Sequence, residues 1–169
     1  VFLDIETTGL NRNSNSITVF GLYDGINTKT MIRGVNLDYS ILKKELQKYK
    51  LLITFNGSSF DIPFIEKICP GLMPKVPHFD VKFLAARLGL KGGLKQIEKT
   101  LNVSRTKIIE EFNGGDALTL WEMYRASGDE YYLNLLVEYN DYDLINLKIV
   151  AEHCVNEMKG KIVAINNKF

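Results

Sequence analysis

Two acidic residues, Asp4 and Glu6, stand one residue apart in the otherwise apolar run Val-Phe-Leu-Asp-Ile-Glu that opens the chain. Side chains alternate across a β-strand, so both carboxylates point from the same face of a strand formed here. Neighbouring carboxylates repel each other, and each loses hydration when it is buried. A divalent cation relieves both costs, and oxygen-only ligands favour hard ions such as Mg²⁺ or Mn²⁺. The pair therefore predicts half of a metal site, which further carboxylates would have to complete.

The rest of the chain divides into short strands followed by helices. Turn and alternation patterns predict strands at residues 1–6, 16–23, 28–33, 51–55 and 76–79, with a turn at Asp24 and Gly25 after the second. Helical spacing predicts helices at residues 38–49, from about 58 to before 70, from 80 to about 88, and at 94–101, 116–126 and 130–158. This order predicts an α/β fold in which a mixed sheet of about five strands, the first three antiparallel, is flanked by helices.

The length and composition indicate one globular domain. A chain of 169 residues can bury one substantial core, and it shows no internal repeat or linker, so we expect a single domain over residues 1–169. Hydrophobic residues make up 46% and charged residues 24%, as in ordinary soluble proteins. The apolar runs are too short to span a bilayer and no secretory leader is visible, so no membrane association is expected. Because the chain begins at a strand without Met, we interpret it as a fragment of a longer or processed protein.

The two cysteines bear on the compartment. Cys69 and Cys154 are far apart and lie in no CxxC or CxxH pattern. Their scarcity and spacing argue against a zinc site and favour a reducing compartment, so we expect a cytoplasmic protein. A disulfide between them is the less favoured alternative.

The charge distribution is more informative than the net charge of +1, which gives no global signature of nucleic-acid binding. Basic residues gather in the middle of the chain: Lys82, Arg87, Lys91, Lys95, Lys99, Arg105 and Lys107. A local basic surface attracts phosphates without a high overall charge. A solvated lysine-rich helix face explains most of these residues at least as well.

Two further acids occupy positions that suit a site. Asp61 follows the buried strand 51–55 through a Gly-containing turn and enters a helix, near the sheet edge where ligands commonly bind. Complementing the helix dipole is the alternative explanation. Asp143 precedes apolar residues at helical spacing, so it lies on the inward face of its helix and needs a partner. Tyr139 shares that face four residues earlier, although core packing alone would also account for it.

Three motifs thus occur in order: Asp4-x-Glu6, Asn56-x-x-x-Phe60-Asp61 and Tyr139-x-x-x-Asp143. Together they resemble the DEDDy group of 3′–5′ exonucleases, part of the ribonuclease-H-like superfamily that includes the proofreading domains of DNA polymerases. Within the group, the chain is most similar to stand-alone exonuclease domains predicted in microbial genomes, over nearly its whole length. Each motif is weak alone, whereas three in order on the expected elements form a strong signal. The resemblance implies a ribonuclease-H-like fold.

The resemblance further implies a site of four carboxylates, Asp4, Glu6, Asp61 and Asp143, around two Mg²⁺ or Mn²⁺ ions. Two ions about 4 Å apart clamp the scissile phosphate and stabilise the attacking and the leaving oxygen. By the same analogy Tyr139 orients the attacking water or helps to deprotonate it. Orientation is favoured, because a tyrosine with an ordinary pKa near 10 is a poor base at neutral pH. The expected reaction releases nucleoside 5′-monophosphates from the 3′ end of single-stranded DNA or RNA.

Four substrate-binding residues are carried over in the same way. Thr7 and Leu10 would touch the terminal nucleotide, Phe60 would stack on a base, and Asn56 would bond a phosphate or sugar. Core packing for Leu10 and Phe60, and a turn at Asn56, are the alternative explanations. Lys95 is either a phosphate contact or a solvated lysine.

Two other functions fit the same pattern. The first is a non-catalytic nucleic-acid-binding module with the same fold. The intact acids weigh against it, because binding phosphates without metals is better served by losing carboxylates. The second is a structure-specific endonuclease, against which the tyrosine-type third motif favours exonuclease action. No protein partner follows from the sequence.

Overall fold

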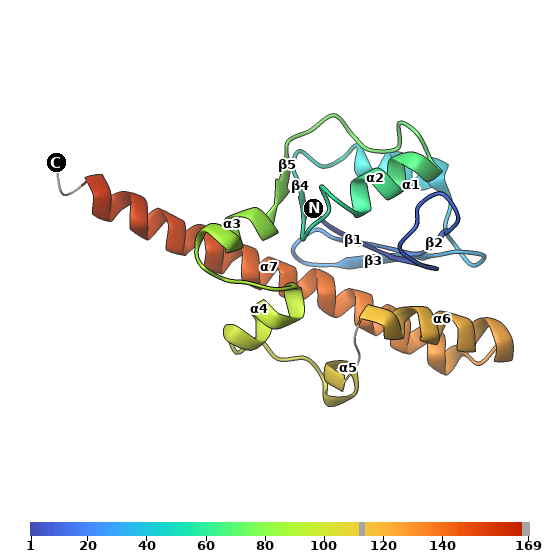
Figure 1. The fold of residues 1–169 in the computed structure, drawn as a ribbon. Coiled ribbons are helices and arrows are strands. Elements are labelled where there is room, and N and C mark those ends of the chain that lie inside the picture. Colours follow the sequence, from blue (N-terminus) through green and yellow to red (C-terminus); the bar gives the residue numbers. More distant parts are fainter. Residues whose placement is uncertain (112–113, 167–169) are drawn as a thin grey trace.

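The structure, a computed structural model, describes residues 1–111 and 114–166. Its strands are β1 (Phe2–Thr7), β2 (Ile17–Tyr23), β3 (Thr28–Ile32), β4 (Leu52–Thr54) and β5 (His78–Asp80). Its helices are α1 (Tyr39–Leu46), α2 (Asp61–Ile68), α3 (Val81–Arg87), α4 (Leu94–Thr100), α5 (Lys107–Glu111), α6 (Gly114–Ser127) and α7 (Glu130–Asn166). Figure 1 shows the helices on both sides of the sheet, with α7 passing across one face.

β1 lies at the centre of a five-stranded sheet whose order is β3-β2-β1-β4-β5. The first three strands are antiparallel and follow one another through the loops 8–16 and 24–27. β4 and β5 run parallel to β1, and helices α1 and α2 carry the chain back before each of them. In the β1–β2 pairing, Asp4 lies opposite Gly21. The predicted α/β fold, with a mixed sheet whose first three strands are antiparallel, is confirmed.

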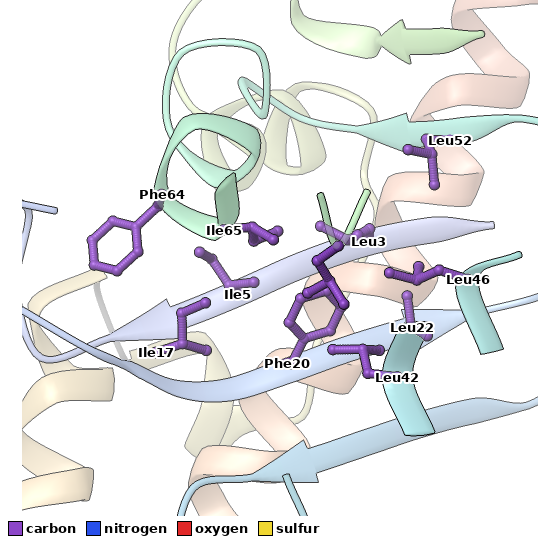
Figure 2. Packing of buried hydrophobic residues seen from close by; sticks show 11 residues of the cluster. Leu3, Ile5, Ile17, Phe20, Leu22, Leu42, Leu46, Leu52, Phe64 and Ile65 are labelled. Atoms are coloured by element: carbon purple, nitrogen blue, oxygen red, sulfur yellow. The ribbon is translucent and has the colours of Figure 1, made fainter. Parts of the chain in front are cut away.

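One face of the sheet packs against α1 and α2. Leu3 and Ile5 of β1 and Phe20 of β2 belong to the buried cluster on this face. Figure 2 shows these side chains meeting those of the two covering helices: Leu42, Leu46, Phe64 and Ile65. Full burial of each such side chain contributes roughly 1.5–3 kcal/mol. Alternation along β1 therefore turns Phe2, Asp4 and Glu6 toward the opposite face.

The opposite face is covered chiefly by α7. Phe2 of β1 packs there with Leu144, Leu147 and Val150 of α7, in a cluster that also takes in α3 and α4. A second cluster on this side joins the amino-terminal half of α7 to α6 and to Val19 of β2. Asp4 and Glu6 share the strand face of Phe2, so they lie under α7. This packing positions the site.

Several element boundaries differ from the predicted ones by one to three residues, among them the end of α1 at Leu46, both ends of α6 and the bounds of β5. One helix, α5, was not predicted. α2 begins at Asp61 rather than near residue 58, because the backbone N–H groups of Ser59 and Phe60 first close a turn onto the carbonyl of Asn56. α5 spans only five residues, too few for a helical period to be visible in the sequence. α7 continues to Asn166, through Gly160, beyond the predicted end at residue 158.

α7 spans 37 residues, and its last turns extend beyond the sheet (Figure 1). A helix interior tolerates a glycine such as Gly160 at a cost of about 1 kcal/mol relative to alanine. Within the described part of the chain, the helices lack the combination of length and apolar character needed to cross a membrane.

Candidate functional site

Alternation along β1 places Asp4 and Glu6 on the sheet face that α7 covers, while Leu3 and Ile5 fill the core on the other face. Both acids are partly buried. Gly21, the cross-strand neighbour of Asp4, has no side chain to separate Asp4 from α7. Both carboxylates of the first motif therefore lie on one strand face, as the sequence predicted, and α7 covers that face.

α7 delivers the third carboxylate. Asp143 lies beside Leu144, which is fully buried between the helix and the sheet and so fixes the helix at this point. One carboxylate oxygen from each of Asp4, Glu6 and Asp143 lies within 4.8 Å of the others. Three oxygens at this spacing can serve as ligands of a single cation.

Asp61 is the fourth acid and lies next to this triad. It is the first residue of α2 and is only 3% exposed. Its Oδ1 accepts a hydrogen bond of 3.2 Å from the backbone N–H of Ile5, between Asp4 and Glu6. This contact holds Asp61 against β1, beyond the point where β4 has ended. Asp61 does not belong to the group within 4.8 Å.

Burial and mutual repulsion raise the pKa values of all four acids. For Asp4 and Glu6, loss of hydration is the main cause, and the charges of Asp61 and Asp143 add to it. Burial raises the pKa of Asp61 to about 7. It also raises the pKa of Asp143, although the neighbouring guanidinium of Arg105 opposes this shift. The donor set consists of carboxylate oxygens alone, and it fits Mg²⁺ or Mn²⁺, which would relieve the repulsion.

Arg105 is buried against the triad. Its Nε and Nη2 donate to both carboxylate oxygens of Glu98, the first at 2.7 Å, and Nη2 also donates to Oδ1 of Asp143. The side chains of Arg105 and Glu98 are each only 3% exposed. The interpretation of Arg105 as part of a basic surface or solvated face is therefore wrong, because its charge is paired with buried carboxylates.

Tyr139 lies one helical turn before Asp143 and is 4% exposed. The ammonium nitrogen of Lys95 lies 4.4 Å from the centre of its ring, a cation–π distance. Burial, followed by the charges of Asp143 and Glu6, raises the pKa of the Tyr139 hydroxyl. The hydroxyl thus stays protonated at neutral pH, which suits an orienting group better than a base.

A cavity of about 590 Å³ opens beside the acids and Tyr139. Its volume lies in the range of ligand pockets. Asp4, Tyr139 and Asp143 line it together with Phe55, Asn56, Lys82, Gly92, Gly93, Leu94 and Lys95. Lys82 donates from Nζ to Oδ1 of Asn56 at 2.9 Å. The cavity thus combines a carboxylate wall with two lysines, a pairing that suits a phosphate-bearing ligand bridged by cations.

Asp80 holds the turn that carries Asn56 into this cavity. The backbone of Asn56 is left-handed, with φ of 64°. The carboxylate of Asp80 accepts from the N–H groups of Asn56 at 2.8 Å, Ser58 at 3.0 Å and Lys82 at 3.2 Å. The bond from Lys82 caps the amino end of α3. The other two fix the turn that leads to Asp61.

The four expected substrate-binding residues do not lie together. Asn56 lines the main cavity, whereas Leu10 and Phe60 line a separate hollow of about 270 Å³. Leu10 is 86% exposed, so core packing does not explain it. Phe60 packs partly against Phe64, with ring centres 5.6 Å apart. Its side chain therefore combines core packing with a place at the surface of the hollow. Thr7 ends β1 beside Glu6, and its hydroxyl donates to the carbonyl of Gly9 at 2.9 Å.

A contact between α7 and Asp4 was also not expected from the sequence. Asn140 is fully buried on α7, and its Nδ2 donates to Oδ2 of Asp4 at 2.8 Å. The only sequence signal was its place between Tyr139 and Asp143, one position off their helix face. Packing against the sheet brings it to Asp4.

A family model described as the RNase_H superfamily matches residues 1–155. The chain belongs to the RNase_H superfamily. Membership agrees with the ribonuclease-H-like fold expected from the motifs, and it supports a nuclease-type hydrolase.

Solved structures share the fold of this RNase_H superfamily chain. One is a family B DNA polymerase from the hyperthermophilic archaeon Pyrobaculum calidifontis, with 12% identity and a TM-score of 0.70 over 91% of this chain and 24% of the polymerase. This chain therefore spans about a quarter of the polymerase's length. Another, described as the apo form of a nuclease, has 17% identity and a TM-score of 0.66 over 95% of this chain and 73% of that one. A comparison with curated proteins gives no match.

Proposed function

We propose that this chain is a metal-dependent 3′–5′ exonuclease that hydrolyses phosphodiester bonds at the 3′ ends of single-stranded DNA or RNA and releases nucleoside 5′-monophosphates. The observation that carries the proposal is the convergence of Asp4, Glu6 and Asp143 within 4.8 Å, with Asp61 held against the same strand. Membership of the RNase_H superfamily supports nuclease chemistry. The direction of cleavage, the products and the identity of the ions go beyond what membership of the superfamily establishes.

The four acids would hold two Mg²⁺ or Mn²⁺ ions. When bound, such ions activate water and stabilise negative charge on the phosphate oxygens. Two ions suit the ligand set better than one. Asp61 lies outside the triad, yet it is close enough for its charge to raise the pKa values of Asp4 and Glu6, so it could hold a second ion beside the first. Four carboxylates would offset the four positive charges of two divalent ions.

The remaining residues of the cavity would bind and orient the substrate. Tyr139, kept protonated by its surroundings, would orient the attacking water through its hydroxyl. Lys82 and Lys95 would contact phosphates, and Asn56 would bond a phosphate or sugar. Leu10 would meet the neighbouring base with Phe60 at the adjacent hollow, where stacking is tolerant of sequence.

We also infer that residues 1–169 act as one domain, because α7 packs against strands from the first part of the chain and against α3, α4 and α6. Cys69 and Cys154 are free thiols, which supports a reducing compartment such as the cytoplasm.

The test is cleavage of 5′-labelled single-stranded DNA and RNA, with Mg²⁺ or Mn²⁺ supplied. The expected result is progressive shortening from the 3′ end, abolished by chelator, by Asp4→Ala and by Asp143→Ala. Asp141→Ala is the matched control, because Asp141 lies on the same helix but accepts from Thr30 at 3.1 Å instead of joining the triad. Absence of metal-dependent degradation by the folded protein contradicts the proposal.

Two further measurements separate the alternatives. A substrate whose 3′ end is blocked should resist an exonuclease, whereas continued internal cleavage would indicate an endonuclease. Binding titrations in chelator address the non-catalytic module. Affinity that is unchanged by metal, together with no turnover, would favour that module.

A further inference from the structure

The side chain of Asn140 lies between α7 and the sheet, beside the first motif. It is fully buried, and Nδ2 lies 2.8 Å from Oδ2 of Asp4. Its neighbours on the helix, Tyr139 and Asp143, both line the main cavity, while Asn140 does not. Asn140 therefore contacts the site only by its hydrogen bond to Asp4 and does not line the cavity.

Gly21 makes the space for this contact. It pairs with Asp4 across β1 and β2, so the two residues occupy the same sheet face. A Cβ atom at position 21 would lie 1.9 Å from Oδ1 of Asn140 and 2.8 Å from Cδ1 of Leu144. Gly21 lies within strand β2, where its backbone is extended. The site therefore requires glycine here because it lacks a side chain, and not because of its backbone conformation.

The chemistry of an amide suits this position. A carboxylate at residue 140 would add a fifth negative charge and would have no hydrogen to donate. A lysine or arginine would donate but would compete with a divalent cation for the same acids. A neutral amide fixes the orientation of Asp4 and leaves the charge of the site unchanged.

We propose that Asn140, seated over Gly21, is a positioning residue that orients Asp4 as a metal ligand. The proposal rests on the metal site of the proposed function. Hydrogen-bond partners of metal ligands hold those ligands in place, and their loss typically weakens metal binding about 10–100-fold. Asn140 acts on the affinity for the ion and does not touch the substrate.

Asn146 offers a matched control. It is also a buried asparagine of α7, 3% exposed, and within the described part of the chain its Nδ2 has no hydrogen-bond partner. The same replacement, Asn→Leu, therefore removes a buried amide from the same helix at both positions. Only at residue 140 does it remove a bond to an acid of the site.

The experiment measures Mn²⁺ binding by calorimetry to the full chain, with thermal unfolding in chelator as a check on folding. Asn140→Leu should weaken Mn²⁺ binding about 10–100-fold. Asn146→Leu should leave it within about twofold of the wild type. Equal affinities of the two variants overturn the inference. No Mn²⁺ binding by the wild type overturns the proposed metal site, and this inference with it.

A second pair of variants tests the same contact from the strand side. Gly21→Ala displaces the carboxamide without removing the donor, and it should weaken Mn²⁺ binding in the same direction as Asn140→Ala. Because both changes break one contact, their effects should not add: the double variant should bind Mn²⁺ about as tightly as Asn140→Ala alone. Fully additive losses would show that Gly21 and Asn140 act separately and would overturn the inference.

Discussion

Arg105 donates a hydrogen bond to Asp143 while Glu98 holds the same guanidinium through both of its carboxylate oxygens. Arg105 and Glu98 cancel each other's charge, so the pair orients Asp143 without changing the net charge of the acidic site. Both side chains are almost completely buried. A buried pair of this kind is sensitive to the loss of one partner, because the other is then left as an uncompensated buried charge.

Arg105→Met should therefore destabilise the fold strongly. We expect the free energy of unfolding to fall by about 3–5 kcal/mol, because Glu98 is left unpaired. The double variant Arg105→Met with Glu98→Leu should recover most of this loss. Urea unfolding in chelator measures both, with Arg87→Met on the exposed surface of α3 as the control. If the double variant is as unstable as the single one, the pairing is not what stabilises this region.

The acids of the site were predictable because each belongs to a local pattern. The alternation of β1 places Asp4 and Glu6 on one face of the strand, and the helical period of α7 places Tyr139 and Asp143 on one face of that helix. The meander of the first three strands follows from turn residues and alternation in the same way. Convergence of these elements in one fold then brings the acids together.

The partners of those acids were not predictable, because long-range packing creates them. Asp143 and Arg105 are 38 positions apart, and Asp4 and Asn140 are 136 positions apart. Arg105 lies between two helices, where no period reveals an inward side chain. The nearest basic residues in the sequence, Lys99 and Lys107, are exposed, so composition indicated a surface where the fold makes a buried ion pair.

Tyr139→Phe should lower kcat and leave Mn²⁺ affinity unchanged, because the proposed role of the hydroxyl is to orient water and not to bind the ion. Loss of one hydrogen bond in the transition state, worth about 1.5–3 kcal/mol in a charged setting, lowers kcat roughly 10–100-fold. The surroundings raise the pKa of Tyr139, so the shape of the pH profile should be the same in wild type and variant up to about pH 9.

Tyr142→Phe provides the control for this experiment, since Tyr142 lies on the same helix and packs against the neighbouring hydrophobic cluster. Single-turnover kinetics at saturating Mn²⁺ separate the chemical step from binding. A rise in rate with pH that disappears in Tyr139→Phe would instead assign the residue a role as base.

Lys82→Ala should weaken the binding of single-stranded nucleic acid and reduce its dependence on salt. A lysine that neutralises one phosphate contributes about 0.7 to the slope of log K against log salt for a single strand. Lys82 lines the main cavity and contacts Asn56, whereas Lys44 is an exposed lysine of α1, on the far side of the sheet. Fluorescence anisotropy in chelator measures the slope, and Lys44→Ala should leave it unchanged. Equal slopes for wild type and Lys82→Ala would show that Lys82 does not contact a phosphate of the bound strand.

The metal-free protein should lose stability as the pH rises from about 5 to about 8. Burial raises the pKa of Asp61 to about 7 in the folded chain, against an ordinary value near 3.9 when unfolded. The folded state thus binds this proton more tightly, so the stability it contributes is complete below about pH 4 and is lost as the pH rises through about 7. The pKa values of Asp4, Glu6 and Asp143 shift in the same direction and strengthen the trend.

Urea unfolding in chelator across this pH range tests the trend. Glu45, whose ion pairs with Lys29 and Lys48 lower its pKa to about 2, titrates below the window and does not interfere. Asp61→Asn should flatten the profile and raise stability at pH 8, whereas Glu157→Gln, at an exposed position of α7, should not. Mn²⁺ should restore the stability of the wild type at pH 8, because the ion binds the ionised acids of the folded state alone. Stability that rises with pH in chelator would show that the four carboxylates are not held together in the folded chain.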